Sequence, residues 1–427
     1  SQMTIGSLGG TWEVGQTVKS TTKESVQENA TRYLEFDSNG NVTNLLSSPQ
    51  SPAYTTTDAD PSLTLKFPAT FPTGKTPDEE LLGGTTLTVT VDAVNAYGST
   101  SDDATVQPEL GTPQSTEGIF GTTLYNGTAG TQSISTGVNT VYGGLIWIKN
   151  LATADHALFD KERTARWHLE SSSPNAQDDN GSGVTVFKTT GFTLEGIAAQ
   201  VNQSDKNYVA WSFGNALGFF TTVKYTGNWF HGRAIPHGLG TKPGCIFVKN
   251  ISNGSEDWYV YHQNVGTDGG LMLNKPDEKY TTESLWANTE PTDTTFTVGG
   301  NAGVNEGDAE FVAYLFADTP GLIKCGTYAG NNSNQFIYTG FDPAWVLIKS
   351  MSSANWFIFD DARNAGNAVY ADLNIEAQDV SNVYLETGGF RLTANSATSL
   401  NKDGDDYMYI AIAKPADFRS MTQEEFQ

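Results

Sequence analysis

The stretch PGCIFVKN, residues 243–250, is a short apolar segment that ends in a lysine and occurs in related form twice more. The relatives are GLIWIKN at 144–150 and AWVLIKS at 344–350, which place lysines at Lys149, Lys249 and Lys349. The three lysines are evenly spaced along the chain. Self-similarity at a fixed period predicts tandem copies of one structural unit.

The similarity extends to both sides of the lysine segment. Each copy opens with a Tyr-x-Gly turn at Tyr125, Tyr225 or Tyr328, followed by an Ile-x-(Thr/His)-Gly step. Downstream come a second apolar segment, which reads HALFD, WYVYH or WFIFD, and a leucine strand around Leu169, Leu273 and Leu373. A Phe-containing strand and a last strand, which reads YVAWSF, FVAYLF or YMYIAI, end each copy. The order of motifs therefore supports three homologous units.

Two further positions recur in every copy. An asparagine, Asn202, Asn305 or Asn401, stands six residues before the first residue of the last strand, and we expect its amide to close a turn. His156 aligns with Trp258 and Trp356, which indicates a packing position that accepts different rings.

The lysine segments are apolar on both faces. Successive side chains of a strand point to opposite sides, so Cys245 and Phe247 share one face and Ile246 and Val248 the other. A sandwich covers only one face of each sheet, so the second face must be covered by a neighbouring copy, a loop or another chain. We expect the lysine to mark the point where the strand emerges into water.

Composition limits the class of protein. The 427 residues carry a net charge of −24, which disfavours nucleic acid and anionic membrane surfaces as partners. No segment approaches the ~18 apolar residues of a membrane span, so no membrane insertion is expected. Abundant Gly, Thr, Ser and Asn with 11% aromatic residues predict an all-β chain of short strands and turns.

The first third differs from the rest. Residues 1–28 have few apolar positions and are expected to be an arm that orders against another subunit. Residues 29–110 alternate like an immunoglobulin-like sandwich, with a hairpin turn at Asn39-Gly40, and 111–118 are expected to be a linker. Three homologous sandwiches are then predicted at 119–220, 221–322 and 323–427.

Catalytic equipment is not evident. The nearest approach to a glycosidase carboxylate pair is Glu35 and Asp37, which have no third carboxylate. No Gly-x-Ser-x-Gly elbow, phosphate loop or complete EF-hand is present, although the turns at 178–182 and 401–406 are acidic. We therefore expect no enzyme activity, no cofactor and no metal site. Cys245 and Cys325 are expected to be buried structural thiols.

One loop points outside the chain. Trp229, Phe230 and His231 occupy the turn of the second copy where the first copy has GTAGTQS and the third has GNNSNQF. Aromatic side chains are costly to expose, so these three either fold back onto a domain or contact a partner or receptor.

The segment GRAIPHGLGTKPGCIFVKN at 232–250, with WYVYH and FVAYLFA after it, resembles a repeat module of structural and tail-fibre-like proteins of tailed bacteriophages, especially marine ones. YGGLIWIKN and DPAWVLIKS are similar to variants of that module. The resemblance covers about 120–427, and the immunoglobulin-like part is similar to modules appended to virion proteins. It implies a virion surface protein with jelly-roll or concanavalin-like, lectin-like sandwiches.

The leading hypothesis is a tail-fibre or receptor-binding component that adheres to a host surface glycan or protein without catalysis. The alternative is a structural decoration or spacer of the capsid or tail, whose arm binds other virion subunits. A polysaccharide depolymerase would need a facing carboxylate pair. A homotrimer would fit both the fibre resemblance and the doubly apolar strands, but copies packed on each other within one chain would fit the pattern as well.

Overall fold

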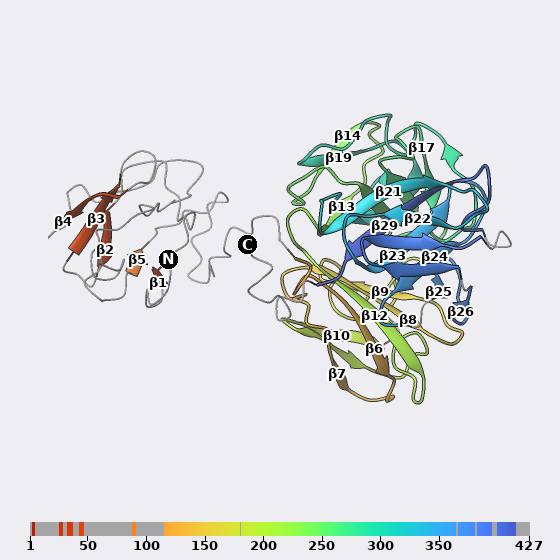
Figure 1. The fold of residues 1–427 in the computed structure, drawn as a ribbon, viewed down its shortest axis with the longest axis horizontal. Helices are drawn as coiled ribbons and strands as arrows, with labels where there is room; N and C mark the ends of the chain where they lie inside the picture. The colour runs from red at the N-terminus through yellow and green to blue at the C-terminus, as the bar shows by residue number, and fades with distance from the viewer. Residues whose placement is uncertain are drawn as a thin grey trace. The chain divides into compact units, whose positions relative to one another are not determined.

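A computed structural model describes residues 115–179, 181–363, 366–380, 382–394 and 399–415, together with five short strands in the first third of the chain. The chain divides into two compact units, Ser1–Glu109 and Leu110–Gln427. In the described residues the regular structure is antiparallel β apart from a single four-residue helix, so the all-β prediction is confirmed (Figure 1). No described helix has the length and apolar character needed to cross a membrane.

The described strands of the first unit form two small sheets. Its strands are β1 (Gln2–Thr4), β2 (Ser25–Glu28), β3 (Arg32–Phe36), β4 (Val42–Leu46) and β5 (Thr88–Thr90). β3 and β4 pair as the hairpin expected around Asn39-Gly40. β2 pairs with β3 and β1 with β5, so these two segments of the expected arm are paired strands within the first unit. The remaining parts of the arm and the immunoglobulin-like segment, residues 111–114 of the linker, and the side chains of Glu35 and Asp37 lie outside the described residues.

Each of the three copies in the second unit pairs a large sheet with a small one. In the first copy the large sheet has the order β6 (Phe120–Asn126), β12 (Asn207–Gly214), β8 (Gly144–Asn150), β9 (Ala157–Asp160). Its small sheet has the order β10 (Gly183–Lys188), β11 (Gly191–Glu195), β7 (Gln132–Ser135).

The second copy repeats this plan with two more strands in the large sheet. Its large sheet has the order β13 (Phe220–Thr226), β20 (Glu310–Phe316), β15 (Cys245–Asn250), β16 (Tyr259–His262), β17 (Gly269–Met272), β18 (Tyr280–Thr281). Its small sheet pairs β14 (Arg233–Pro236) with β19 (Thr295–Val298), and the helix α1 (Ala302–Asn305) precedes β20.

The third copy has the same arrangement. Its large sheet has the order β21 (Ile323–Ala329), β29 (Asp406–Ala413), β23 (Pro343–Ser350), β24 (Trp356–Asp360), β25 (Asn367–Tyr370), β26 (Gln378–Asp379). Its small sheet has the order β22 (Gln335–Tyr338), β28 (Gly389–Leu392), β27 (Val383–Glu386). The tandem sandwiches predicted from the repeat are therefore observed.

Strand registers define which residues are equivalent. Leu158 of the first copy pairs with Leu169. Its counterparts are Val260, which pairs with Leu271, and Ile358, which pairs with Val369. The predicted alignment of Leu273 and Leu373 with Leu169 was therefore wrong. The paired residues stand eleven positions apart in every copy, so loop length is not the cause. The third copy has Val369 instead of a leucine there, and shifts of two residues (Leu273) and four residues (Leu373) preserve the face, so alternation cannot detect them.

Two of the three lysine strands, β8 and β23, contribute to two cores each, whereas both faces of β15 belong to the shared core. On β23, Trp345 and Leu347 join a core that all three copies share, whereas Val346 and Ile348 join a core inside the third sandwich. β8 divides its side chains in the same way between the shared core and the interior of the first sandwich. The second apolar face is thus covered by neighbouring copies of the same chain.

Aromatic rings from all three copies meet in the shared core. The ring centroid of Phe213 lies 5.9 Å from that of Phe316 in the second copy and 5.7 Å from that of Trp345 in the third. Both contacts are edge-to-face, the geometry that aromatic pairs favour. The doubly apolar strands therefore require no second chain to cover them and do not by themselves indicate a homotrimer.

The copies form a closed ring. Backbone amides of Gln177, Lys279 and Ala377 donate to carbonyls of the next copy, at Ile251, Met351 and, closing the ring, Leu151. The aligned residues His156, Trp258 and Trp356 each make an equivalent contact with the preceding copy. Trp258 Nε1 donates to Glu170 O (2.9 Å), Trp356 Nε1 donates to Met272 O (2.8 Å), and His156 Nε2 lies 2.8 Å from Tyr370 O. Because His156 Nδ1 accepts from Trp147 Nε1, its Nε2 is the donor. The residue at the predicted packing position therefore also forms a hydrogen bond between copies.

The three lysines do not emerge into water. Lys149, Lys249 and Lys349 are all 0% exposed, on the face that points to the shared core. Each Nζ donates to the carbonyl of the next residue and to one in the loop that follows; Lys249 and Lys349 also reach Pro174 and Pro276 of the preceding copy. The expectation was wrong because a carbonyl cage can satisfy an ammonium group without water.

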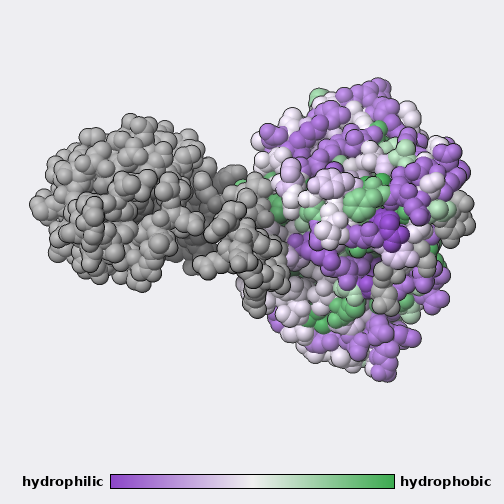
Figure 2. Space-filling model, viewed as in Figure 1, coloured by the Kyte–Doolittle hydropathy of each residue, from purple (hydrophilic) through white to green (hydrophobic). Residues whose placement is uncertain are grey.

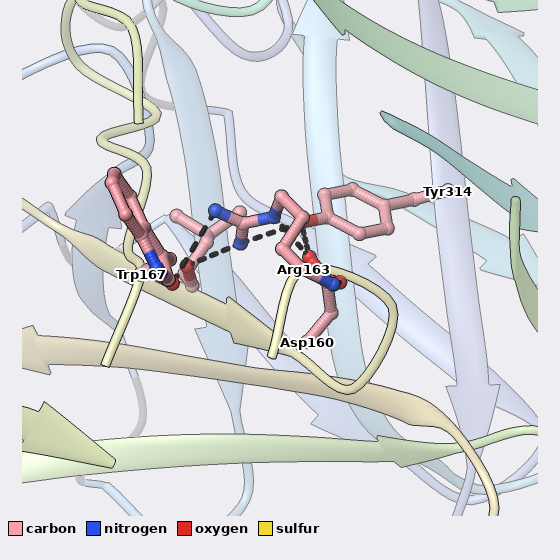
Figure 3. Close-up of polar contacts among 5 residues, drawn as sticks. Asp160, Arg163, Trp167 and Tyr314 are labelled. Atoms are coloured by element: carbon pink, nitrogen blue, oxygen red, sulfur yellow. Dashed lines mark hydrogen bonds and ion pairs between the residues drawn. The ribbon is translucent and has the colours of Figure 1, made fainter. Parts of the chain in front are cut away.

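Buried ion pairs lie at two of the three seams. Arg163 Nε contacts Asp160 Oδ2 within the first copy, and the hydroxyl of Tyr314 from the second copy donates to the same carboxylate oxygen at 2.7 Å (Figure 3). At another seam Asp360 contacts Arg363 at 2.7 Å and accepts from Trp211 of the first copy at 3.0 Å. At the third seam, His262 stands at the strand position that Asp160 and Asp360 occupy in the other copies.

Replacing Tyr314 by Phe tests this seam. The change leaves the buried Asp160 carboxylate without one donor, so we expect a loss of about 1.5–3 kcal/mol in the free energy of unfolding. Urea denaturation measures it. Tyr142→Phe, whose side chain is exposed, is the control and should change stability by less than about 0.5 kcal/mol. Equal behaviour of the two variants would contradict the role of the Tyr314 hydroxyl.

The lysine cages predict a pH dependence. Burial lowers the pKa of Lys249 to about 8, so between pH 8 and its unfolded pKa the unfolded chain binds more protons and stability rises with pH. For one lysine the rise between pH 7.5 and 9 is about 1 kcal/mol. Lys249→Met should show a smaller rise by that amount in urea denaturation. The buried thiols of Cys245 and Cys325, whose pKa values burial raises, act in the opposite direction in both proteins. Identical slopes would mean that Lys249 is not desolvated.

Candidate functional site

The Tyr-x-Gly turn and the recurring asparagine form one device in each copy. The hydroxyls of Tyr125, Tyr225 and Tyr328 donate at 2.7 Å to the carbonyl of the residue before the asparagine. A Cβ on the turn glycine would lie within about 2 Å of the carbonyl oxygen of the residue after it, at Gln203, Glu306 or Lys402. This close approach explains why the turn requires glycine.

The asparagine amide holds the loop that follows the turn. In the second copy, Asn305 Oδ1 accepts from Asn228 N (3.0 Å), and its Nδ2 donates to Phe230 O (3.0 Å) and Gly299 O (2.9 Å). Asn202 and Asn401 make the corresponding contacts in the other copies. All three asparagines are buried. The predicted turn-closing role is confirmed, and the amide also ties two loops together.

The aromatic loop, defined as Trp229, Phe230 and His231, follows this device in the second copy. Trp229 has a φ of +61°, and its counterparts Ala129 and Asn332 have φ values of 56° and 52°. Asparagine tolerates this left-handed conformation, whereas for a bulky residue it is strained. Such strain is a reason to look for a function.

The loop presents its rings to solvent. Trp229 is 51% and Phe230 65% exposed, and His231 is exposed as well. The indole lies over Gly307, where a Cβ would come within 2.5 Å of Trp229 Cδ1. The equivalent residues in the other copies are Ser204 and Asp403, so the second copy alone has the space for this ring. On the face shown in Figure 2 the surface is mostly hydrophilic with separate hydrophobic patches.

The backbone beneath the rings is fixed. Trp229 N donates to Asn305 O (2.8 Å), Phe230 N to Asn228 Oδ1 (3.0 Å), and Gly232 N to Val298 O (3.0 Å). Arg233, at the start of β14, lies 5.9 Å from the ring centroid of Tyr225. The site is therefore a preformed loop with two exposed aromatic side chains followed by an exposed histidine, which is suited to contact with an apolar or ring-shaped surface.

The structure brings the three predicted contact residues together and keeps them exposed. Part of Trp229 folds back onto its own copy, where the indole covers Gly307. The positive φ of Trp229 was not predicted. Asn332 at the equivalent position of the third copy was the available sequence signal for it, since asparagine accepts the left-handed conformation.

Titratable clusters do not extend the site. Within the described ranges, no group of three or more His, Cys, Asp or Glu side chains is placed to hold a metal ion. The buried carboxylates of Asp160 and Asp360 are paired with arginines in the interior, away from solvent.

A family model with the description "Domain of unknown function (DUF7483)" matches residues 116–415, more than half of the chain. The chain belongs to the DUF7483 family. No curated protein matches it.

The limits of the DUF7483 match coincide with the closure of the ring. The match begins at Thr116, whose hydroxyl donates to the carbonyl of Ala413 at 2.9 Å in a buried position. It ends at residue 415, just after the last strand of the third copy. The DUF7483 unit is therefore the ring of three sandwiches, because a single sandwich would leave its second apolar face exposed.

Replacing Trp229 by Asn, the residue of the third copy, tests whether the indole side chain is needed for the stability of the fold. We expect the free energy of unfolding to rise by about 0.5–1 kcal/mol, because Asn accepts the positive φ at lower cost. Urea denaturation measures the change, and Phe230→Ser, also the third copy's residue, should be neutral. A loss of more than about 1 kcal/mol for Trp229→Asn would show that the indole mainly stabilises the fold.

Proposed function

We propose that this DUF7483 protein is a non-catalytic binding protein of the surface of a tailed bacteriophage, acting as a tail-fibre or receptor-binding component. The aromatic loop of the second copy is its contact with a host surface glycan or protein. The resemblance of 232–250 to tail-fibre-like modules supports the setting. The observation that carries the proposal is the strained, exposed Trp229 on a fixed backbone.

Rigidity supports a binding role. A loop that is already ordered loses little conformational entropy on binding, so more of the contact energy appears as affinity. Aromatic residues are the most frequent anchors of protein interfaces. The two other copies keep the same backbone device with Ala129-Gly130 and Asn332-Ser333 in place of Trp229-Phe230. The aromatic side chains are thus a specialisation of one copy.

A structural decoration or spacer is the second candidate. The closed ring, whose first and last strands meet through Thr116 and Ala413, makes a self-contained body suited to repetition on a particle. In that case the aromatic loop would contact another virion subunit, and the first unit would also attach to the particle. A depolymerase is less well supported, since Asp160 and Asp360 are buried and paired.

Adsorption to cells tests the proposal. Fluorescently labelled full-length protein is titrated onto a panel of candidate host bacteria, with unlabelled protein as competitor. We expect saturable, competed binding that the double variant Trp229→Asn/Phe230→Ser weakens at least about tenfold. Tyr142→Ser, which removes an exposed ring from the first copy, is the matched control and should bind like the wild type.

Two results would count against the receptor role. If no cell in the panel binds while purified particles lacking the protein do, the chain is a structural component. If cells bind and the double variant binds equally well, the contact lies elsewhere on the molecule. Thermal unfolding of each variant confirms that it is folded before its binding is compared.

A further inference from the structure

A second exposed aromatic surface lies on the small sheet of the third copy. We define the aromatic platform as Phe336, Tyr338 and Tyr384 together with Arg391. Phe336 and Tyr338 alternate along the edge strand β22 and are 46% and 68% exposed. Phe336 pairs with Arg391 on β28, and Arg391 pairs with Tyr384 on β27, so the side chains form a row across the three strands.

The rings of β22 lie against glycine backbone. A Cβ on Gly389 would be 2.9 Å from Phe336 Cζ, and one on Gly388 would be 3.5 Å from Tyr338 Cε2. One side of each ring is therefore covered by the turn at 388–389. Gly388 replaces Thr190 and Thr294 of the other copies, which provides the space for Tyr338.

Comparison of equivalent positions in the three copies shows that the fold does not need these aromatic side chains. By strand register, Phe336 and Tyr338 correspond to Ser133 and Ser135 in the first copy and to Ala234 and Pro236 in the second. Arg391 corresponds to Thr193 and Thr297, and Tyr384 to Val186. The same small sheet thus forms in the other copies with mostly small residues at these positions, and the third copy carries three rings there.

The guanidinium at the platform is already neutralised by a carboxylate. Arg391 Nε is 2.7 Å from Glu386 Oε1, and its guanidinium lies 4.4 Å from the ring centroid of Tyr384. Lys324 Nζ donates to Tyr338 O at 3.1 Å and lies 6.0 Å from that ring. A chain with a net charge of −24 also repels polyanions. The surface therefore suits an uncharged ligand.

We propose that the aromatic platform is a binding site for a neutral glycan with equatorially substituted pyranose rings. The C–H faces of such sugars are apolar and flat enough to pack on Phe336, Tyr338 and Tyr384. Their hydroxyls can accept from the Arg391 guanidinium and donate to Glu386 at the rim, as small-ligand sites combine apolar surface with a few polar groups. The site is on a different copy from the aromatic loop and does not depend on the proposed receptor role.

Calorimetric titration of the full chain with cellohexaose and xylohexaose tests this site. We expect saturable binding of at least one of these probes and weaker binding of the hexamer of β-1,4-linked glucuronate, the anionic counterpart of cellohexaose. The variant Phe336→Ser/Tyr338→Ser carries the residues of the first copy and should lose at least about tenfold in affinity. Arg391→Thr, the residue of both other copies, should weaken binding to a smaller extent. Tyr142→Ser is the matched control for loss of an exposed ring.

Several outcomes would overturn the proposal. The proposal is wrong if neither neutral hexasaccharide binds at millimolar concentration. It is also wrong if the β-1,4-linked glucuronate hexamer binds more tightly than cellohexaose. Wild-type affinity of the folded Phe336→Ser/Tyr338→Ser variant would place the glycan elsewhere. If that variant instead dissociates an oligomer in sedimentation velocity, β22 is a contact between subunits. Measuring cell adsorption and cellohexaose binding on both the loop and platform variants separates a failure at one site from a failure at the other.

Discussion

The fold depends on burying both faces of three apolar strands. β8 and β23 each place one set of side chains inside their own sandwich and the other set in a common core, and both sets of β15 belong to that common core. Removing the second set from water is worth about 25 cal/mol for each Å² of apolar surface, and no single sandwich can achieve it. Packing the three copies around aromatic side chains such as Phe213 and Trp345 buries this second set. The closed arrangement of three copies is therefore the smallest form of the repeat that buries both faces.

The seams between copies show how polar groups are accommodated in such a core. Each lysine strand ends in a buried ammonium held by carbonyl oxygens, and two seams contain a carboxylate paired with an arginine and an aromatic donor. Buried charges add little net stability, but a charge left without its partners is costly. The polar contacts therefore favour one arrangement of the copies over alternatives in which the apolar faces meet out of register.

Duplication within one chain allows the copies to diverge. A homotrimer would carry the same loop three times, whereas here the device built on Asn202, Asn305 and Asn401 supports three different loops. Aromatic side chains are concentrated in the loop of the second copy and on the small sheet of the third. The conserved backbone in each copy provides the rigid support that a contact residue needs, and it leaves the outward positions free to vary.

The sequence by itself determined the all-β class, the three copies, the doubly apolar strands and the position of Trp229 in a turn, because these follow from period, alternation and residue type. It could not determine what covers the second apolar face, since a neighbouring copy and another chain satisfy the same pattern. The burial of Lys149, Lys249 and Lys349 was also decided only by the tertiary structure, because the carbonyls that hold them come from loops and, for two of them, from the preceding copy. The platform of Phe336, Tyr338 and Tyr384 joins strands that are distant in sequence, and only their pairing with β28 places the rings in one row.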